Sequence, residues 1–529
     1  LYGQPVDGGE PLEYSDALFK CIDEILVNAL DQYINAINLP VGKGGPVTEI
    51  RIGFDVATGE ITVSNDGQGM PIYRMDDPDN PKLPENEKPW TVNNIITKEF
   101  TGSNFDDEGS PDRVTGGING LGIKVVNALC SRLEIETVDW NNFRYYNQVC
   151  LDGMNQICEP VVTDLKNDRK SEAYLALTEY QQKPHTTMKF IPNYTELCKV
   201  SSRKKDPKWY NSERAETVRK LIETRTYQLA AFVASTNYRY DGDECIEYKK
   251  KAKIYFNDKL IEIKSLSDYA MMYGLNNVVS AEIKSTATQR KNSDEIVRFP
   301  WTIAVNVSPS AITDREAEGI VYDTVEYKSF EQVSLLNAVH LTKGGSHVNA
   351  LLKMIQEALR SRIEKLLGTK HTDEKGKPKD LPAPVLKNNL FIFNSLQIPI
   401  PQFAGQTKES VTLSSSDLKS FKEIYELPKS FITKIWELLE PILKYKFLIQ
   451  NTGTKVKKQN FVRKYEKAKF AGKRQADECG LFVPEGDSAE TTINSIITSR
   501  KSKLSKDYFG TYNIQGVPMN ALKEIKEIV

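Results

Sequence analysis

The stretch CIDEILVNALD, residues 21–31, has the composition of a helix that is apolar almost all round, yet it carries a carboxylate and an amide. Glu24 and Asn28 are four residues apart, so both side chains lie on one face of that helix. A carboxylate among apolar side chains costs free energy unless a bound cation or a polarised water compensates its charge. Taken alone, the pair is also typical of solvent-facing residues near a helix end. The motifs further along the chain decide between these two interpretations.

The pattern around this stretch mixes predicted helices and strands. Ser15 is a suitable N-cap for a helix that runs to about Ala36, and alternating apolar residues predict a hairpin over residues 50–65. Strands with intervening helices continue to about residue 265. Beyond that point we expect strands in WTIAVNV (301–307), EQVSLLNAV (331–339) and NNLFIFNSLQIPIPQF (388–403), a long helix in GGSHVNALLKMIQEALRSRIEKLL (344–367), and a strand, turn and helix in ECGLFVPEGDSAE (478–490). The mixture predicts an α+β fold class.

Length and composition exclude several classes of protein. A chain of 529 residues is long enough for two or three domains. Its 70 Lys and Arg balance 71 Asp and Glu, so a nucleic-acid surface would have to come from local clusters of charge. The seven scattered cysteines contain no C-x-x-C pair, which argues against a disulfide framework or a zinc site. No apolar run approaches the ~18 residues that span a bilayer, so we expect a soluble, intracellular protein with no membrane partner.

Two glycine-rich turns follow the first helix. In NDGQGM (65–70) the carboxylate of Asp66 could accept the exocyclic amine of an adenine, while Gly67 and Gly69 allow close approach of the backbone. In TGGINGLGIK (115–124) four glycines precede a helix that begins near Ile123, and Lys124 adds a charge to a cradle for phosphate. Neither the P-loop nor the dinucleotide fingerprint is present. Each turn alone is more often a hairpin turn or a flexible loop.

In this order the motifs E-x-x-x-N, D-x-G-x-G and G-x-x-G-x-G resemble the Bergerat (GHKL) ATPase fold, an α/β sandwich. The stretches FKCIDEILVNALD, SNDGQGMPI, GSNFDD and VTGGINGLGIK are more closely similar to eukaryotic and large-virus type IIA DNA topoisomerases. Farther on, GQTKES (405–410) and LLNAVHLTKGGSHV (335–348) resemble the transducer domain, and PEGDSAE (484–490) resembles the first acidic motif of the TOPRIM domain. The resemblance runs from about residue 14 to the C-terminus and is weakest in 155–215 and 270–300.

The resemblance implies a role for individual residues. Glu24 would be the general base that activates the attacking water, and Asn28 the protein ligand of Mg²⁺ on the triphosphate of ATP. Gln406 and Lys408 would sense the γ-phosphate from the transducer, and Glu485 would bind Mg²⁺ in TOPRIM. The implied ATP-binding residues are Asn28, Asn65, Asp66, Gly67, Gly69, Ser103, Asn104, Gly117, Ile118, Asn119, Gly120, Leu121, Gly122, Ile123, Lys124, Gln406, Thr407 and Lys408.

The resemblance also implies four regions: a GHKL ATPase domain (1–265), a transducer domain (266–450), a basic linker (451–477) and the start of TOPRIM (478–529). Two positions depart from the family pattern. Ile118 stands where an Arg is usual, and Gln515 lies in NIQGVPMN, which replaces a more basic motif near DNA. No D-x-D follows Glu485, so the DNA-cleavage centre is incomplete in this sequence. We therefore expect the chain to be part of a longer polypeptide or assembly.

The implied function is that of an ATP-dependent type II topoisomerase: ATP binding would dimerise the ATPase domains and close a gate on double-stranded DNA. The DNA cleavage-reunion region would belong to the same polypeptide or to a separate subunit. The Lys-rich segments 370–379 and 451–475 could contact DNA phosphates, although such runs are often solvated linkers. One alternative is a dedicated ATPase subunit, and another is a GHKL clamp that binds DNA without cutting it. The nucleus, a viral factory and the host cytoplasm remain alternative locations.

Overall fold

A computed structural model of the chain divides it into two compact units, one of residues 1–311 with 328–444 and the other of residues 312–327 with 445–529. No helix in the part of the chain that the structure describes is both long and apolar enough to cross a membrane. The described residues are 15–38, 45–76, 82–99, 120–198, 210–236, 238–241, 244–247, 251–273, 275, 277–283, 288–289, 296–297, 301–307, 331–367, 384–387, 389–398, 403–405, 408–412, 426–451, 465–473, 475–484, 487–498 and 504–512.

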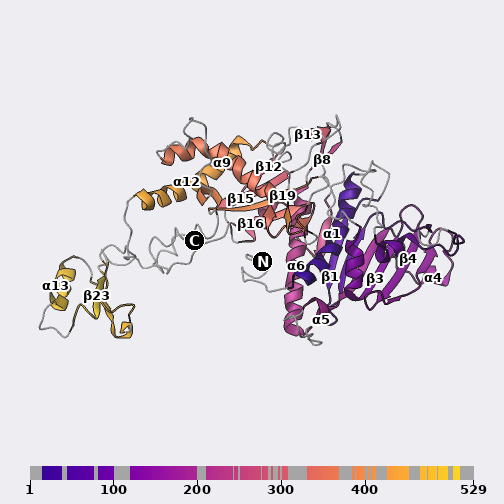
Figure 1. Cartoon of the computed structure of the whole chain (residues 1–529), viewed down its shortest axis with the longest axis horizontal. Coiled ribbons are helices and arrows are strands. Elements are labelled where there is room, and N and C mark those ends of the chain that lie inside the picture. The colour runs from indigo at the N-terminus through magenta and orange to yellow at the C-terminus, as the bar shows by residue number, and fades with distance from the viewer. Residues whose placement is uncertain are drawn as a thin grey trace. The chain divides into compact units, whose positions relative to one another are not determined.

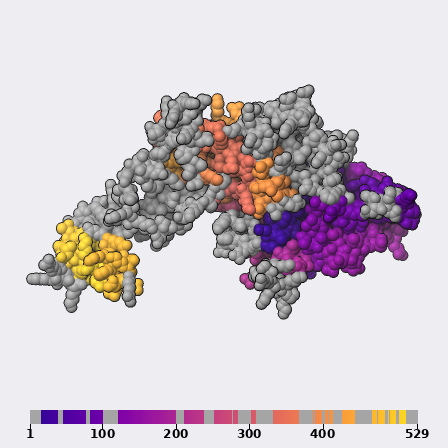
Figure 2. Space-filling model, in the orientation of Figure 1, coloured from indigo at the N-terminus to yellow at the C-terminus, as the bar shows by residue number. Residues whose placement is uncertain are grey.

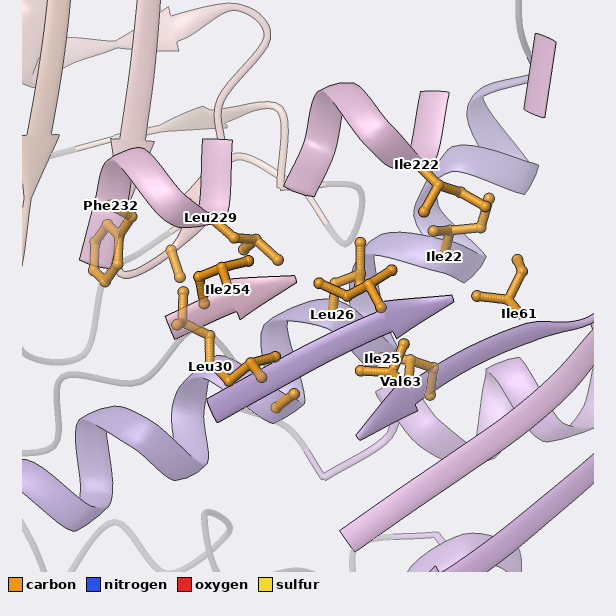
Figure 3. Packing of buried hydrophobic residues seen from close by; sticks show 14 of the residues in the cluster. Ile22, Ile25, Leu26, Leu30, Ile61, Val63, Ile222, Leu229, Phe232 and Ile254 are labelled. Carbon is orange, nitrogen blue, oxygen red and sulfur yellow. The ribbon is translucent and has the colours of Figure 1, made fainter. Parts of the chain in front are cut away.

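The first helix, α1 (Asp16–Asn38), begins where the sequence predicts and ends two residues later than expected. The hydroxyl of Ser15 accepts a hydrogen bond from the backbone N–H of Leu18 at 3.4 Å, as an N-cap does. The helix is apolar nearly all round because it is covered on several sides. Figure 3 shows Ile25 of α1 beside Val63 of the neighbouring sheet, and Ile22 beside Ile222 of another helix.

The first unit contains a large nine-stranded sheet in the order β11-β10-β1-β2-β7-β3-β4-β5, with β6 paired to β4 (Figure 1). Its strands are β1 (Glu49–Phe54), β2 (Ile61–Asp66), β3 (Cys130–Val138), β4 (Arg144–Leu151), β5 (Gln156–Ile157), β6 (Val161–Asp164), β7 (His185–Pro192), β10 (Lys253–Phe256) and β11 (Lys259–Leu260). The predicted hairpin over residues 50–65 is confirmed, because β1 pairs antiparallel with β2, and β10 and β11 form a second antiparallel hairpin. The parallel pairing of β1 with β10 joins segments that are about two hundred residues apart.

Helices cover the apolar face of this sheet. They are α1, α2 (Thr91–Thr97), α3 (Gly122–Ala128) and α6 (Ser212–Ser235). Two further helices, α4 (Glu172–Leu175) and α5 (Tyr194–Leu197), have only four residues each. α1 contacts β2, β7, α3 and α6, so it lies between the sheet and the other helices. This arrangement explains the uniformly buried apolar residues of α1 and holds Glu24 inside the layer.

A second sheet of the same unit has the order β12-β15-β19-β16-β17. Its strands are β12 (Val279–Ile283), β15 (Trp301–Val307), β16 (Glu331–Leu336), β17 (Val339–His340) and β19 (Leu390–Leu396). The long helix α9 (Ser346–Leu367), confirmed as predicted, lies in the chain between the parallel strands β16 and β19. Every residue of β15 and β19 is buried, which requires cover on both faces of the sheet.

The two faces of the second sheet have different neighbours. Ile303 and Ile392 belong to one core with α9 and α12 (Lys429–Asn451), whereas Ala304 and Phe393 belong to the same core as the large sheet. α7 (Leu266–Met271) also contacts β15 and β19. On the surface drawn in Figure 2, the indigo and purple atoms of the first sheet and its helices lie next to the salmon and orange atoms of the second sheet region. The shared core makes the two sheets one unit.

The first unit also contains three small ladders and a short helix. β8 (Tyr238–Asp241) pairs with β9 (Glu244–Glu247), β13 (Thr288–Gln289) with β14 (Ile296–Val297), and β18 (Gly344–Gly345) with β20 (Ser410–Val411); α10 is Pro384–Lys387. The second unit has a three-stranded sheet of β21 (Tyr465–Glu466), β23 (Phe509–Tyr512) and β22 (Gly480–Phe482), with the short helix η1 (Ala476–Glu478). β22 is followed by α13 (Asp487–Thr498), which confirms the predicted strand and helix.

Candidate functional site

Glu24 is the centre of the candidate site. It lies on α1 and only 8% of its surface is exposed. Its Oε1 atom accepts a hydrogen bond from the Nζ of Lys408 at 3.0 Å, although the two residues are 384 positions apart. The Nζ of Lys20, one turn earlier on α1, lies 3.0 Å from the same oxygen. The structure therefore brings together two residues that the sequence analysis placed in one site, and it adds Lys20 to them.

The charges of this group support one another. Burial by itself raises the pKa of Glu24, but the ammonium groups of Lys408 and Lys20 outweigh it and hold the pKa below its ordinary value. Burial likewise lowers the pKa of Lys20, while the carboxylates of Asp23 and Glu24 reverse that effect and leave it raised. Glu24 is consequently ionised at neutral pH. Lys20 also lies 3.5 Å from Asp23, which binds Arg225, so three cations face two carboxylates in this cluster. The excess of one positive charge favours an anionic ligand.

The second carboxylate oxygen of Glu24 faces the start of α3. A Cβ atom added at Gly122 would lie 2.4 Å from Oε2, so a side chain at this position would force the carboxylate of Glu24 to move. Gly122 is the first residue of α3, and that helix has no side-chain cap at its N-terminus. One oxygen of Glu24 is thus held by lysines, and the other faces Gly122, the last glycine of the loop that the sequence predicts to bind phosphate.

Lys408 is held in place by the ladder between β18 and β20. Gly344 and Gly345 pair with Ser410 and Val411, and a Cβ at Gly345 would lie 2.5 Å from the carbonyl oxygen of Val411. The backbone of Lys408 has φ 53°, a conformation that costs a non-glycine residue about 1 kcal/mol or more. The glycines of the KGG motif are therefore required for the close approach that positions Lys408.

Lys124 and the described end of the glycine loop, Gly120 to Gly122, lie at the start of α3, which Glu24 faces. Lys124 is on α3, is 5% exposed, and donates a hydrogen bond from Nζ to the carbonyl of Gly120. Burial lowers the pKa of Lys124 to about 8. The backbone at Gly120 has φ 59°, which glycine adopts without strain. Leu121 and Ile123 complete this described segment, and Ile123 is buried.

The turn after β2 gives its two polar residues different surroundings. The carboxylate of Asp66 accepts hydrogen bonds from the backbone N–H groups of Thr48 at 2.7 Å and Glu49 at 2.9 Å, and from the hydroxyl of Thr48. These donors tie the turn to the start of β1. Asn65 is 4% exposed and its side-chain amide donates to the carbonyl of Asp66 at 2.8 Å. Asp66 thus has a bracing contact in addition to its predicted role beside adenine.

Gly67 and Gly69 have φ values of 118° and 66°, which favour glycine. A Cβ at Gly69 would lie 1.9 Å from the carbonyl oxygen of Val138, so the turn packs directly against the end of β3. The glycines of this motif are explained by that close packing, whatever ligand the turn binds.

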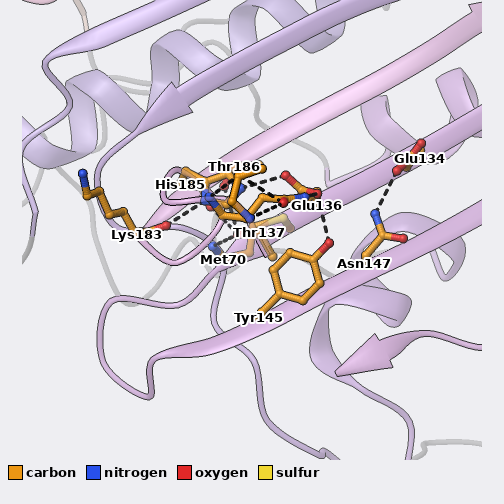
Figure 4. A network of polar contacts seen from close by, with 11 residues as sticks. Met70, Glu134, Glu136, Thr137, Tyr145, Asn147, Lys183, His185 and Thr186 are labelled. Carbon is orange, nitrogen blue, oxygen red and sulfur yellow. Dashed lines mark hydrogen bonds and ion pairs between the residues drawn. The ribbon is translucent and has the colours of Figure 1, made fainter. Parts of the chain in front are cut away.

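Two threonines that the sequence did not single out continue the row of Asn65 across the helix-covered face of the sheet, Thr186 next to Asn65 and Thr137 next to Thr186. Thr186 of β7 pairs with Asn65 on one side and with Thr137 of β3 on the other. The hydroxyl of Thr137 accepts a hydrogen bond from the backbone N–H of Met70 at 2.9 Å and lies 3.2 Å from the hydroxyl of Thr186 (Figure 4). Their signal in the sequence is a polar residue at a position where the alternation predicts core.

The opposite face of the same strands carries a polar network that fixes their ends. His185 Nε2 lies 3.1 Å from Glu136 Oε1, and Glu136 also accepts hydrogen bonds from Tyr145 at 3.0 Å and Gln181 at 2.6 Å (Figure 4). Burial raises the pKa of Glu136, but its hydrogen bonds to His185, Gln181 and Tyr145 hold it below the ordinary value. The network links β3, β4 and β7 on the face opposite to Asn65.

The remaining predicted residues divide into two groups. Asn28 is half-buried on α1, on the stripe that also carries Glu24. Within the described ranges no group of three or more His, Cys, Asp or Glu could hold a metal ion. The other predicted positions lie outside the described residues: Ser103, Asn104, Gly117, Ile118, Asn119, Gln406, Thr407 and Glu485, together with Gln515.

Family models match two parts of the chain. Residues 13–147 match the family described as histidine kinase-, DNA gyrase B- and HSP90-like ATPase, and residues 273–459 match DNA gyrase B. The first range contains α1, the turn after β2 and the glycine loop. The second contains the strands of the second sheet and Lys408. The mixed α/β architecture and the GHKL ATPase fold predicted from the sequence are confirmed.

The curated relatives that match the chain are DNA topoisomerases. DNA topoisomerase 2 of Arabidopsis thaliana is 27% identical over 519 residues, covering 96% of this chain and 28% of the relative. That of Saccharomyces cerevisiae is 26% identical over 518 residues, covering 95% of this chain and 30% of the relative. The chain therefore spans less than a third of the length of these relatives.

Solved structures show the fold. The ATPase and transducer domains of DNA topoisomerase II from Balamuthia mandrillaris match with a TM-score of 0.57 at 23% identity, covering 84% of this chain and 88% of that one. The ATPase region of Saccharomyces cerevisiae topoisomerase II bound to ICRF-187 matches with a TM-score of 0.53 at 23% identity, covering 82% and 86%. The family models, the curated relatives and these structures agree: the chain is similar to type II DNA topoisomerases, and its fold is similar to that of their ATPase and transducer domains.

Proposed function

We propose that this chain is the ATP-hydrolysing, gate-closing part of a type II DNA topoisomerase. The ATPase part is the large sheet with its helices, and the transducer part is the second sheet with α9 and α12. The observation that carries the proposal is the contact between Lys408 of the transducer part and Glu24 of the ATPase part, at 3.0 Å between Nζ and Oε1. This contact supports direct communication between the hydrolytic base and the second domain.

Glu24 would accept a proton from the water that attacks the γ-phosphate of ATP. Its Oε2 atom, which faces Gly122, is the oxygen available for that water. Lys408 would leave Glu24 for the γ-phosphate, because a triphosphate carries more negative charge than one carboxylate. Glu24 would then lose one of its two cations and become a stronger base. Asn28 would hold Mg²⁺ on the phosphates, and Asn65 and Asp66 would hold the adenosine side of the nucleotide, with Thr186 next to Asn65.

The proposed partners are double-stranded DNA, a second copy of the chain and a DNA cleavage-reunion region. ATP binding would join two ATPase parts, and hydrolysis would release them. The region from residue 478 onward would begin a TOPRIM domain with Glu485 as a Mg²⁺ ligand, and the basic segment 451–475 would lie near DNA phosphates. The boundaries at 265, 450 and 477 belong to the same proposal. The setting would be intracellular, wherever the DNA substrate is located.

Replacing Glu24 by Ala tests the proposal. We expect the variant to bind a fluorescent ATP analogue about as well as the wild type and to lose ATP hydrolysis, because only the transition state needs the base. Glu179→Ala is a matched control: Glu179 is an exposed residue of the ATPase part that pairs only with Lys183 in the contacts described. Wild-type hydrolysis by the Glu24→Ala variant would refute the role of Glu24.

A further inference from the structure

We propose that Arg225 is a positioning residue of the ATPase reaction: together with Asp23 it fixes α1 against the transducer hairpin at Ala338 and so sets the reach of Lys408. The inference rests on the proposed function, because it concerns the geometry of that same site. It assigns a task to the residue that precedes Glu24 in the chain, which the ATPase chemistry itself leaves unused.

Arg225 is a fully buried charge that joins three elements. Its Nε atom donates to Oδ1 of Asp23 at 2.6 Å, and both side chains are 1% exposed. Its Nη2 atom donates to the carbonyl oxygen of Ala338, and its Nη1 atom lies 3.5 Å from Oε1 of Gln228. A guanidinium can hold two acceptors in fixed directions, which an ammonium cannot do. The side chain therefore connects α1, α6 and the turn between β16 and β17.

The turn at Ala338 is in its own right tied to the chain that carries Lys408. Asn337 and Ala338 have φ values of 45° and 66°, the backbone of a tight hairpin turn. The side chain of Asn337 donates to the carbonyl of Ile398 at 2.7 Å and accepts from its N–H at 2.9 Å. Ile398 follows β19 and precedes Lys408 by ten residues. On its other side the turn leads through β17 to Lys343, whose backbone N–H donates to the carbonyl of Glu409 at 2.9 Å, next to Lys408. Movement of the turn relative to α1 would thus shift the described residues that hold Lys408.

Consecutive residues of α1 therefore make two different contacts with the transducer part. Asp23 binds the turn through Arg225. Both side chains are buried from solvent, so a nucleotide cannot reach this contact. Glu24 binds Lys408 directly, by a contact that a γ-phosphate can replace. The first contact is fixed and the second is exchangeable. A fixed contact beside an exchangeable one lets Lys408 move between two partners without losing its alignment, since small misplacements of reacting groups slow an enzyme greatly.

The test is a double-variant cycle in the 529-residue chain with ATP hydrolysis as the readout. Asp23→Asn and Arg225→Lys are measured alone and with Lys408→Ala, and kcat and KM for ATP are recorded separately. We expect each single variant to lower kcat about tenfold or more with KM unchanged within about twofold, and to have no further effect once Lys408 is absent. Arg219→Lys is the matched control: Arg219 is on the same helix but pairs with Glu216 and Glu223 at the surface. It should leave kcat unchanged.

Thermal melting of every variant shows whether it is folded at the assay temperature. If Asp23→Asn is unfolded there, the comparison is made with Arg225→Lys, which retains the buried positive charge. An unchanged kcat in the folded single variants overturns the inference, and so does an equal fall in kcat with and without Lys408, which would mean a purely structural role. Wild-type chain that fails to bind and hydrolyse ATP would instead contradict the proposed function, so the two failures are distinguishable.

Discussion

At the scale of single residues, the site is organised by the two oxygens of Glu24. One oxygen is held by Lys408 and Lys20, each at 3.0 Å, and the other faces Gly122. The sequence predicts Glu24 and Lys408 because both lie in motifs with a chemical reason for their spacing. It does not predict Lys20, since a lysine one turn before a glutamate is an ordinary surface pair on most helices. Lys20 becomes part of the site only because α1 is buried in the folded protein.

Gly122→Ala should disable hydrolysis with little effect on folding. The new methyl group would lie 2.4 Å from Oε2 and 3.1 Å from Cδ of Glu24, so the carboxylate must move from its position between the lysines and α3. We expect kcat to fall by about a hundredfold, the scale associated with a shift of about 1 Å. Gly53→Ala is the control, because a Cβ there makes only ordinary contacts of 3.6 and 3.9 Å. Equal ATPase rates for the two variants would be inconsistent with this geometry.

At the scale of elements, the sequence predicts local structure well and pairing poorly. Helix α1 and the hairpins β1–β2 and β10–β11 follow from apolar periodicity and turn residues, which are local signals. The parallel pairs β1–β10 and β16–β19 do not, because their registers depend on contacts between distant segments. For the same reason the row of Asn65, Thr186 and Thr137 across three strands can be recognised only in the folded sheet.

Asn337→Ala should destabilise the transducer part through the turn between β16 and β17. The variant loses two buried hydrogen bonds with Ile398, worth about 1 kcal/mol each, and leaves the N–H and C=O of Ile398 without them. We expect the free energy of unfolding to fall by about 2 kcal/mol or more in chemical denaturation. Asn277→Ala is the control, because Asn277 also has a positive φ of 61° but is exposed. A similar loss in both variants would assign the effect to the backbone alone.

Two buried histidines of the second sheet region give a pH dependence of stability. Burial lowers the pKa of His347 to about 4 and that of His340 to about 3, from 6.5. The unfolded chain therefore binds these protons first, so stability is constant above pH 6.5 and falls as pH decreases toward the folded pKa values.

At pH 5.5 each of these histidines should cost about 1.4 kcal/mol relative to pH 7.5, one pKa unit below the unfolded value. Denaturation of the wild type at the two pH values, compared with a His347→Leu variant, measures the effect. The variant should lose less stability on acidification than the wild type. Identical losses in the two proteins would show that His347 does not carry the effect.

At the scale of the whole molecule, the ATPase and transducer parts are joined by a polar seam as well as by a shared core. The hydroxyls of Ser235 and Ser395 are 2.6 Å apart, and the amide of Gln397 donates to the hydroxyl of Thr236 at 3.0 Å. The sequence alone identifies two domains by resemblance. It does not predict that Phe393 and Ala304 of the second would complete the core of the first, because either domain could bury them internally.

Lys408→Ala should impair ATP-driven closure more than ATP binding. The variant removes the hydrogen bond that links Glu24 to the transducer part, while the contacts of Asn65, Asp66 and Lys124 among the described residues stay intact. We expect near-normal affinity for an ATP analogue, but nucleotide-dependent crosslinking of two copies should be strongly reduced. Lys343→Ala is the control, because Lys343 pairs with Glu409 in an exposed ion pair beside the same ladder. Undiminished crosslinking of the Lys408 variant would remove Lys408 from the closing step.

The central claim is that one nucleotide is held between α1 and the segment that carries Lys408. A structure of the chain with Mg²⁺ and a non-hydrolysable ATP analogue tests it most directly. We predict the γ-phosphate within hydrogen-bonding distance of the Nζ of Lys408, with Oε2 of Glu24 directed at the adjacent water. A nucleotide bound elsewhere, or Lys408 still paired with Glu24 and remote from the γ-phosphate, would contradict the account.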